Sequence, residues 1–136
     1  MPSAVVALIV FVLWTILLLL AIAVARIGKV MRGQARATDF PGGVPHGTEA
    51  YWRLNRAHAN CVENLPLFAA LVLSAAATGY SNPTFDQLAW AVALARIPQS
   101  LVHISSGSEV AINARFAFFA VQVFSMSAMA IMLLQA

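Results

Sequence analysis

The sequence predicts an all-α integral membrane fold, a bundle of four transmembrane helices. Three observations predict it: 61% of the 136 residues are hydrophobic, only 10% are charged, and the mean hydropathy is +0.82. A soluble domain carries roughly 25% charged residues, so water is not the main solvent of this chain. The length suits a single domain over residues 1–136, with no room for a large soluble domain beside the helices.

The first predicted helix covers residues 3–25, which carry no charge. A run of this length crosses a hydrocarbon core of about 30 Å. A cleaved signal peptide is the alternative, with Ala21, Ala23 and Ala25 as small residues before the cleavage site. We expect an uncleaved anchor, because no basic residue precedes the run and because it exceeds the usual apolar region of a signal peptide.

The second predicted helix covers residues 49–78 and is apolar only in its second half. Thr48 is the expected N-cap, and Glu49 suits the first turn. The apolar half is too short to span a bilayer alone. The charged half must therefore extend out of the membrane or lie inside a bundle, where neighbours satisfy its polar groups.

The third predicted helix covers residues 84–104 and the fourth about 109–135. Asn82 before Pro83 has the form of a cap followed by a first helical residue. Arg96 and a proline interrupt the third helix. No internal repeat links the four helices.

Charge distribution predicts how the chain crosses the membrane. The connection after the first helix is rich in bases, whereas the turn at 79–86 has none. The positive-inside rule then places the first loop in the cytoplasm and both termini outside, as in a multi-pass protein of a bacterial inner membrane. The formal charge of +3, without a polybasic stripe, makes nucleic acid a poor partner. The single cysteine, Cys61, forms no internal disulfide.

A polar ridge on the second helix is the main candidate site. The stretch RLNRAHANCVENLPLFAAL, residues 53–71, turns from charged to apolar. At 100° per residue, five side chains fall within about 100° of one another, namely Arg53, Arg56, Asn60, Glu63 and Asn64. His58 points elsewhere. Such a row can hold a zwitterion. The alternative for Arg53 and Arg56 is a solvated face at the membrane surface, but an acid as close to the apolar run as Glu63 costs energy unless it is paired.

Arginines within the later helices are further candidates. A charge at a helix centre costs about 2.5 to 3.5 kcal/mol on insertion scales, so Arg96 and Arg115 are functional suspects. Arg96 could instead form an internal ion pair with Glu63, and Arg115 could reach the lipid phosphates. His103 could line the site and donate a proton, or be a satisfied core histidine. Cys61 is interpreted as a packing residue, and the phenylalanines at 116–124 as packing or lipid-contact residues.

The segments RAHANCVENLPLF, ARIPQSLVH and NARFAFFAV resemble the membrane-associated proteins in eicosanoid and glutathione metabolism, the MAPEG family. The resemblance covers nearly the whole chain. It implies a homotrimer of four-helix subunits that binds glutathione between neighbours at the cytoplasmic side. The implied activity is transfer of glutathione to a lipophilic electrophile that arrives from the membrane lipid, with peroxidase activity left open.

The same resemblance assigns roles to residues. Arg53, Arg56, Asn60 and Glu63 would hold the tripeptide, and His58 would reach a neighbour's site. Arg96 matches an arginine deep in the bundle, and Arg115 the one beside the glutathione sulfur. The remaining candidates are Asn64 and His103. Leukotriene-forming members have tyrosines at the positions of Asn64, Gln99 and His103, so an eicosanoid-specific pocket is not expected.

Two other functions stay open. One is a non-catalytic lipid-binding scaffold of the same family, and the other is a small transporter built on Arg96 and Glu63. The retained arginines at 53, 56 and 115 favour the enzyme. Four short helices without inverted repeats argue against the transporter.

Overall fold

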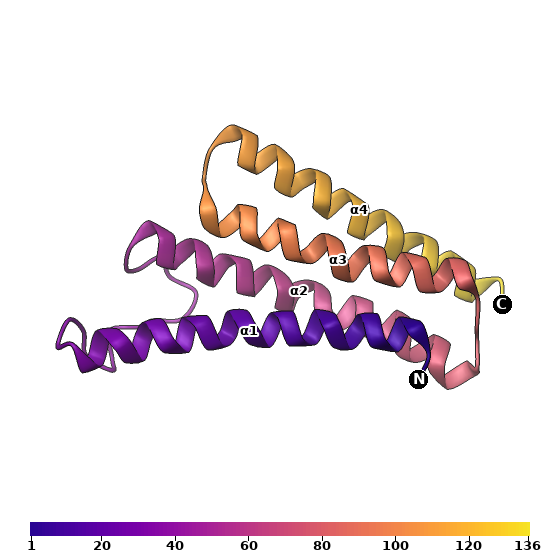
Figure 1. Cartoon of the computed structure of the whole chain (residues 1–136), viewed down its shortest axis with the longest axis horizontal. Coiled ribbons are helices and arrows are strands. Elements are labelled where there is room, and N and C mark those ends of the chain that lie inside the picture. The colour runs from indigo at the N-terminus through magenta and orange to yellow at the C-terminus, as the bar shows by residue number, and fades with distance from the viewer.

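The computed structural model describes residues 1–136 and contains four helices. These are α1 (Ser3–Met31), α2 (Glu49–Thr78), α3 (Pro83–Ser105) and α4 (Glu109–Leu134). Both termini and the α2–α3 connection lie at one end of the bundle, and the other two connections lie at the opposite end (Figure 1). The fold is all-helical, as predicted.

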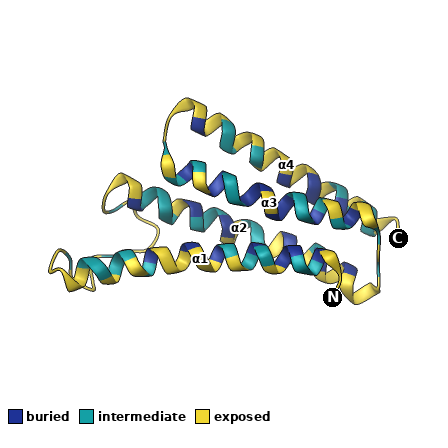
Figure 2. Ribbon diagram, in the orientation of Figure 1, coloured by how far each residue is buried: buried dark blue, intermediate teal, exposed yellow.

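Three helices, α1, α2 and α4, are long and apolar enough to cross a membrane. Helix α3, which was also predicted to span the membrane, is not among them, because polar residues such as Arg96, Gln99 and His103 lower its hydropathy. Its position accounts for this composition. It contacts all three other helices, and 9 of its 23 residues are buried, as the dark blue stretches of α3 in Figure 2 show. A larger share of α3 is therefore covered by the other helices, whereas α1, α2 and α4 expose more of their surface.

The first helix is longer than predicted. It continues beyond residue 25 to Met31 and includes Arg26 and Lys29. Charge marks the end of the apolar run, but it does not end a helix, because arginine and lysine are good helix formers. The helix stops before Gly33, which has a left-handed φ of 69°.

Helix caps place the later elements as the sequence predicts. The Thr48 side chain accepts from the backbone N–H of Tyr51, and Asn82 accepts from Thr84 at 2.8 Å. Ser108, which was not predicted as a cap, caps α4 in the same way and accepts from the Ala111 N–H. Each bond satisfies an N–H that has no partner within the helix, and so fixes where α2, α3 and α4 begin.

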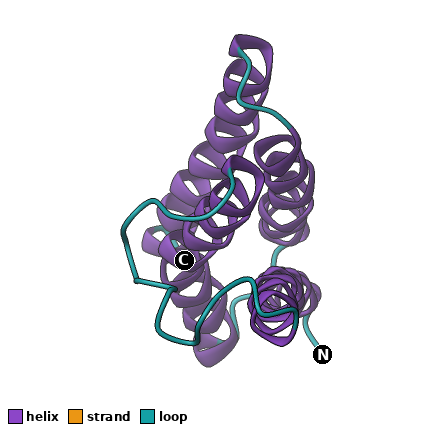
Figure 3. Ribbon diagram, turned by 90° about the vertical axis from the view of Figure 1, so that its left-hand side faces the viewer, coloured by secondary structure: helices purple, strands orange, loops and turns teal.

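The long connection between α1 and α2 is tied to both helices. Arg26 Nε donates to the Tyr51 hydroxyl at 2.8 Å, and Lys29 Nζ lies 4.4 Å from the centroid of the Tyr51 ring. Gly47, with a φ of 72°, lies so close to Tyr51 that a Cβ there would come within 2.8 Å of the ring. Figure 3 shows the connection as the loop that joins the ends of α1 and α2.

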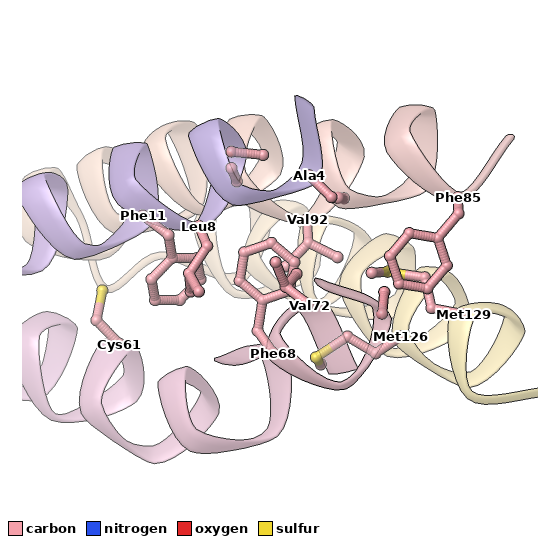
Figure 4. Packing of buried hydrophobic residues seen from close by; sticks show 14 of the residues in the cluster. Ala4, Leu8, Phe11, Cys61, Phe68, Val72, Phe85, Val92, Met126 and Met129 are labelled. Atoms are coloured by element: carbon pink, nitrogen blue, oxygen red, sulfur yellow. The ribbon is translucent and has the colours of Figure 1, made fainter. Parts of the chain in front are cut away.

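The hydrophobic core lies between α1, α2 and α3 and extends to the end of α4 (Figure 4). The Phe11 and Phe68 rings pack with centroids 5.6 Å apart, and Met129 closes the core from α4. Cys61 is fully buried in this cluster, with Sγ 3.7 Å from Ser100 Oγ. The interpretation of Cys61 as a packing residue is confirmed.

Polar contacts join α1 to α3 at the end that carries the termini. The Asp86 carboxylate accepts from the backbone N–H of Ala4 at 3.0 Å, and Trp90 Nε1 donates to Ser3 Oγ at 3.0 Å. No side chain of α1 itself caps its first turn. A residue 82 positions later in the chain therefore supplies the acceptor.

Candidate functional site

A cavity of about 280 Å³ lies between α2, α3 and α4. Nine side chains line it: Asn60, Glu63 and Asn64 from α2, Arg96 and Gln99 from α3, and Ile112, Arg115, Phe116 and Phe119 from α4. Six of the nine are polar or charged. A polar cavity inside a chain of this hydropathy is a candidate binding site.

The α2 wall is one helical face, as predicted for the polar ridge. Asn60, Glu63 and Asn64 stand at i, i+3 and i+4 and all line the cavity. The Asn64 amide donates to the Asn60 carbonyl at 2.8 Å, and Asn60 Nδ2 lies 3.2 Å from His103 Nδ1. Glu63 is exposed and forms no ion pair within the chain. Its carboxylate is free to accept a cation.

Arg96 brings an unpaired charge to the cavity from α3. The residue is only 1% exposed, yet its Nε and Nη2 have no hydrogen-bond partner. The ion pair with Glu63 that the sequence allowed is absent, since the chain's ion pairs are Arg36–Asp39 and Arg53–Glu49. A buried guanidinium without an acceptor is a strong site for an anionic group.

The α4 wall combines charge and apolar surface. Arg115 lies in the second turn of α4, is half-buried and lines the cavity without an ion pair. Ile112, Phe116 and Phe119 follow one another at i, i+4 and i+7 along the same helical face. The phenylalanines at 116 and 119, interpreted from sequence as packing or lipid-contact residues, therefore also border this cavity, and Phe116 is 69% exposed.

Four candidates from the sequence lie outside the cavity lining. Arg53 Nε donates to the Ile104 carbonyl at 3.1 Å, and its Nη1 lies 3.6 Å from Glu49. His103 is buried beside Asn60. Arg56 is exposed and His58 half-buried on other parts of α2. The predicted ridge therefore divides: its later half faces the cavity, and Arg53 binds the end of α3.

Sequence reasoning treated Gln99 only as a departure from a tyrosine and did not consider Gln122. Both are buried amides between α3 and α4. An uncharged amide within an otherwise apolar helix needs a hydrogen-bond partner, so the sequence does indicate that these two glutamines are paired. It does not indicate which helix supplies the partner.

The arrangement can bind a molecule that carries both signs of charge next to an apolar group. Arg96 and Arg115 supply donors for anions, Glu63 accepts a cation, and the amides of Asn60 and Asn64 border both. Such a cavity suits a small zwitterionic molecule with an apolar group beside it.

Comparison with known proteins assigns nearly the whole chain to one family. The model of the MAPEG family matches residues 4–135. No curated protein and no solved structure matches the chain.

Proposed function

The chain belongs to the MAPEG family, and we propose that it conjugates glutathione to lipophilic electrophiles within the membrane. The family includes glutathione transferases and synthases, and it consists of integral membrane proteins, which agrees with the three membrane-spanning helices. One observation carries the proposal: the unpaired guanidinium of Arg96 shares a cavity with Arg115 and with the unpaired carboxylate of Glu63.

The residues present suit glutathione, which has two carboxylates and one ammonium group. Arg96 has two buried nitrogens, Nε and Nη2, without acceptors, and a carboxylate would satisfy them. Glu63 would accept from the ammonium group, and the Asn60 and Asn64 side chains would border the peptide backbone. Arg53 and His103 would not contact glutathione directly. Arg53 holds the end of α3, and His103 holds Asn60.

Arg115 is the proposed catalytic residue. A thiol with a pKa near 8.5 is only slightly ionised at pH 7, and the thiolate is the nucleophile. Lowering the thiol pKa by two units takes about 2.7 kcal/mol. A guanidinium in a poorly hydrated cavity always carries its charge and can supply much of this stabilisation. The thiol proton passes to water, the thiolate forms a C–S bond to the acceptor carbon, and the leaving group departs with the electron pair.

The acceptor site is proposed at the apolar strip on α4. Ile112, Phe116 and Phe119 border the cavity beside Arg115, and Phe116 is largely exposed. A lipophilic acceptor dissolved in the bilayer can reach such a strip without crossing water. The polar half of the cavity then holds the thiol donor and the apolar half its partner.

Assembly as a homotrimer is proposed to complete the site. Arg56 and Glu63 are exposed on α2 of a single chain. Glu63 lies midway along this helix, where a charge that faces lipid costs about 2.5 to 3.5 kcal/mol. A neighbouring subunit that covers this face removes that cost and brings His58 and Arg56 within reach of the bound peptide. Cross-linking of the protein in native membranes tests the number of subunits.

The proposal is tested by glutathione binding and by conjugation to a chloronitrobenzene, with the native protein and Arg115→Ala in detergent. We expect both proteins to bind glutathione and only the native one to release chloride at an appreciable rate. Arg36→Ala, at an exposed position in the loop after α1 and outside the cavity, is the matched control and should react normally. If the native protein does not bind glutathione, the transferase proposal fails, and a scaffold or transporter function replaces it.

A further inference from the structure

Two buried amides fasten α4 to α3 beside the cavity. Gln122 on α4 is completely buried, and its Nε2 donates to Gln99 Oε1 at 2.8 Å and to the Phe118 carbonyl at 3.0 Å. Gln99 Nε2 donates in turn to the Arg115 carbonyl at 3.2 Å. The hydrogen bonds run from α4 to α3 and back to α4, and they end on the backbone of the proposed catalytic residue.

These bonds connect two points of α4 to one side chain of α3. Arg115 and Gln122 are seven residues apart, which is about two helical turns or 10 Å. Helix α4 packs mainly on α3, meets α2 only slightly and does not contact α1. Figure 1 shows α4 diverging from α3 toward its own N-terminal end, where Arg115 lies. The hydrogen bonds of Gln99 and Gln122 are the ones that join this part of α4 to α3.

Stability alone does not account for Gln122. A buried amide costs free energy unless every polar atom is paired, and Gln122 Oε1 has no partner. An apolar side chain of similar length would fill the same space without that cost. A residue that lowers stability while it links two walls of a candidate site fits a role in the site.

We propose that Gln122 is a positioning residue, which acts through Gln99 to hold Arg115 at the cavity. This inference rests on the proposed function for its catalytic consequence, although the positioning itself is a property of the helices. Gln99 lines the cavity and Gln122 does not, so Gln122 does not need to touch glutathione. Without Gln122, Gln99 loses its donor and is free to turn into the cavity, and the Arg115 backbone loses its fixed partner.

The variant Gln122→Met keeps the length of the side chain and removes its amide group. We expect kcat for conjugation to fall about 10-fold, since small displacements of catalytic groups have large effects on rate, while the dissociation constant of glutathione changes less than about threefold. The midpoint of the pH–rate profile should move to higher pH, because a displaced Arg115 stabilises the thiolate less. Ser125→Ala, which removes another buried polar group of α4, is the control and should leave kcat, the dissociation constant and the midpoint unchanged.

A double-mutant cycle tests whether Gln122 acts through Gln99. If it does, Gln99→Met and the double variant should have nearly the same kcat, because the second change removes nothing further. Additive losses in the double variant, or an unchanged pH–rate profile in Gln122→Met, overturn the inference even when the native protein is an active transferase.

Distance measurement separates this inference from the proposed function. Nitroxide labels at Val62→Cys on α2 and Val110→Cys on α4, both exposed, report the separation of the helices in a Cys61→Ala background. We expect a broader distribution of distances in labelled protein with Gln122→Met than in labelled protein with the native Gln122. An unchanged distribution contradicts positioning by Gln122. Absence of conjugation by the native protein, with a broadened distribution in the variant, rejects the transferase function and keeps the positioning role.

Discussion

The guanidinium of Arg96 lies 5.3 Å from the centroid of the Phe11 ring, in the middle of the bundle and without a carboxylate partner. A desolvated cation–π contact is worth about 2 kcal/mol. The effective penalty for burying an ion is several kcal/mol, so the contact offsets only part of the cost. The fold therefore keeps an arginine that lowers its stability, which suits the anion-binding role proposed for it.

Replacement of Arg96 should separate stability from binding. We expect Arg96→Met to raise the free energy of unfolding by about 1 kcal/mol or more, because it removes an uncompensated charge and retains the volume. The same variant should lose at least about 10-fold in glutathione affinity. Thermal unfolding in detergent and calorimetric titration measure the two effects. A destabilised variant would mean that the guanidinium already has partners in the unliganded protein.

Glu63 should recognise the ammonium group of glutathione. We expect Glu63→Gln to lower glutathione affinity about 10-fold or more, since a hydrogen bond to a charged group contributes about 1.5 to 3 kcal/mol. Thermal stability should stay the same, because Glu63 is exposed and forms no ion pair. N-Acetylglutathione supplies the matched ligand. The native protein should bind it more weakly than glutathione, and Glu63→Gln should not distinguish the two. Equal discrimination by both proteins would place the ammonium group elsewhere.

Arg53 and Arg56 should differ although both lie on the predicted ridge. Arg53 donates to the Ile104 carbonyl near the end of α3. Arg53→Gln should therefore lower the free energy of unfolding by roughly 1 kcal/mol, and with it the unfolding temperature. Arg56 is exposed and has no such bond, so Arg56→Gln should leave stability unchanged and weaken glutathione binding in the assembled protein. Thermal unfolding and glutathione titration of both variants measure the two effects. A stable Arg53→Gln with weakened binding would return Arg53 to the ligand set.

Much of this architecture could be predicted from the sequence, because local rules govern it. Thr48 and Asn82 fixed two helix starts through capping chemistry, and the 100° spacing correctly grouped Asn60, Glu63 and Asn64. The end of α1 was misplaced because Arg26 ends an apolar run without ending a helix. Contacts between residues far apart in the chain could not be predicted, because local sequence patterns do not show which helices pack together.

The candidate site shows the same division. Helical spacing indicated the α2 ridge, and the cost of a charge within a membrane helix singled out Arg96 and Arg115. Only the resemblance to a family assigned all of them to one binding site. The bond from Arg53 to the Ile104 carbonyl could not be foreseen, since a backbone acceptor leaves no trace in the sequence. Gln122 was missed for a related reason: one amide in an apolar helix indicates that a partner exists, but the partner is identified only when α3 and α4 are packed.

Cys61 should be inert in the folded protein. Its side chain is completely buried against Ser100, so we expect little labelling by a maleimide before unfolding and full labelling after it. Cys61→Ala should retain conjugation activity, which would leave glutathione as the only thiol in the reaction. Loss of activity in a normally folded Cys61→Ala would instead give the protein thiol a direct part in the chemistry.

The carboxylate that caps the start of α1 bears on the biogenesis of the protein. The ribosome must add 82 further residues after Ala4 before Asp86 exists. The nascent first helix therefore enters the translocon with its leading amides dependent on interfacial water. It gains its permanent acceptor only when the third helix arrives, so the docking of these two segments is a late event of membrane assembly.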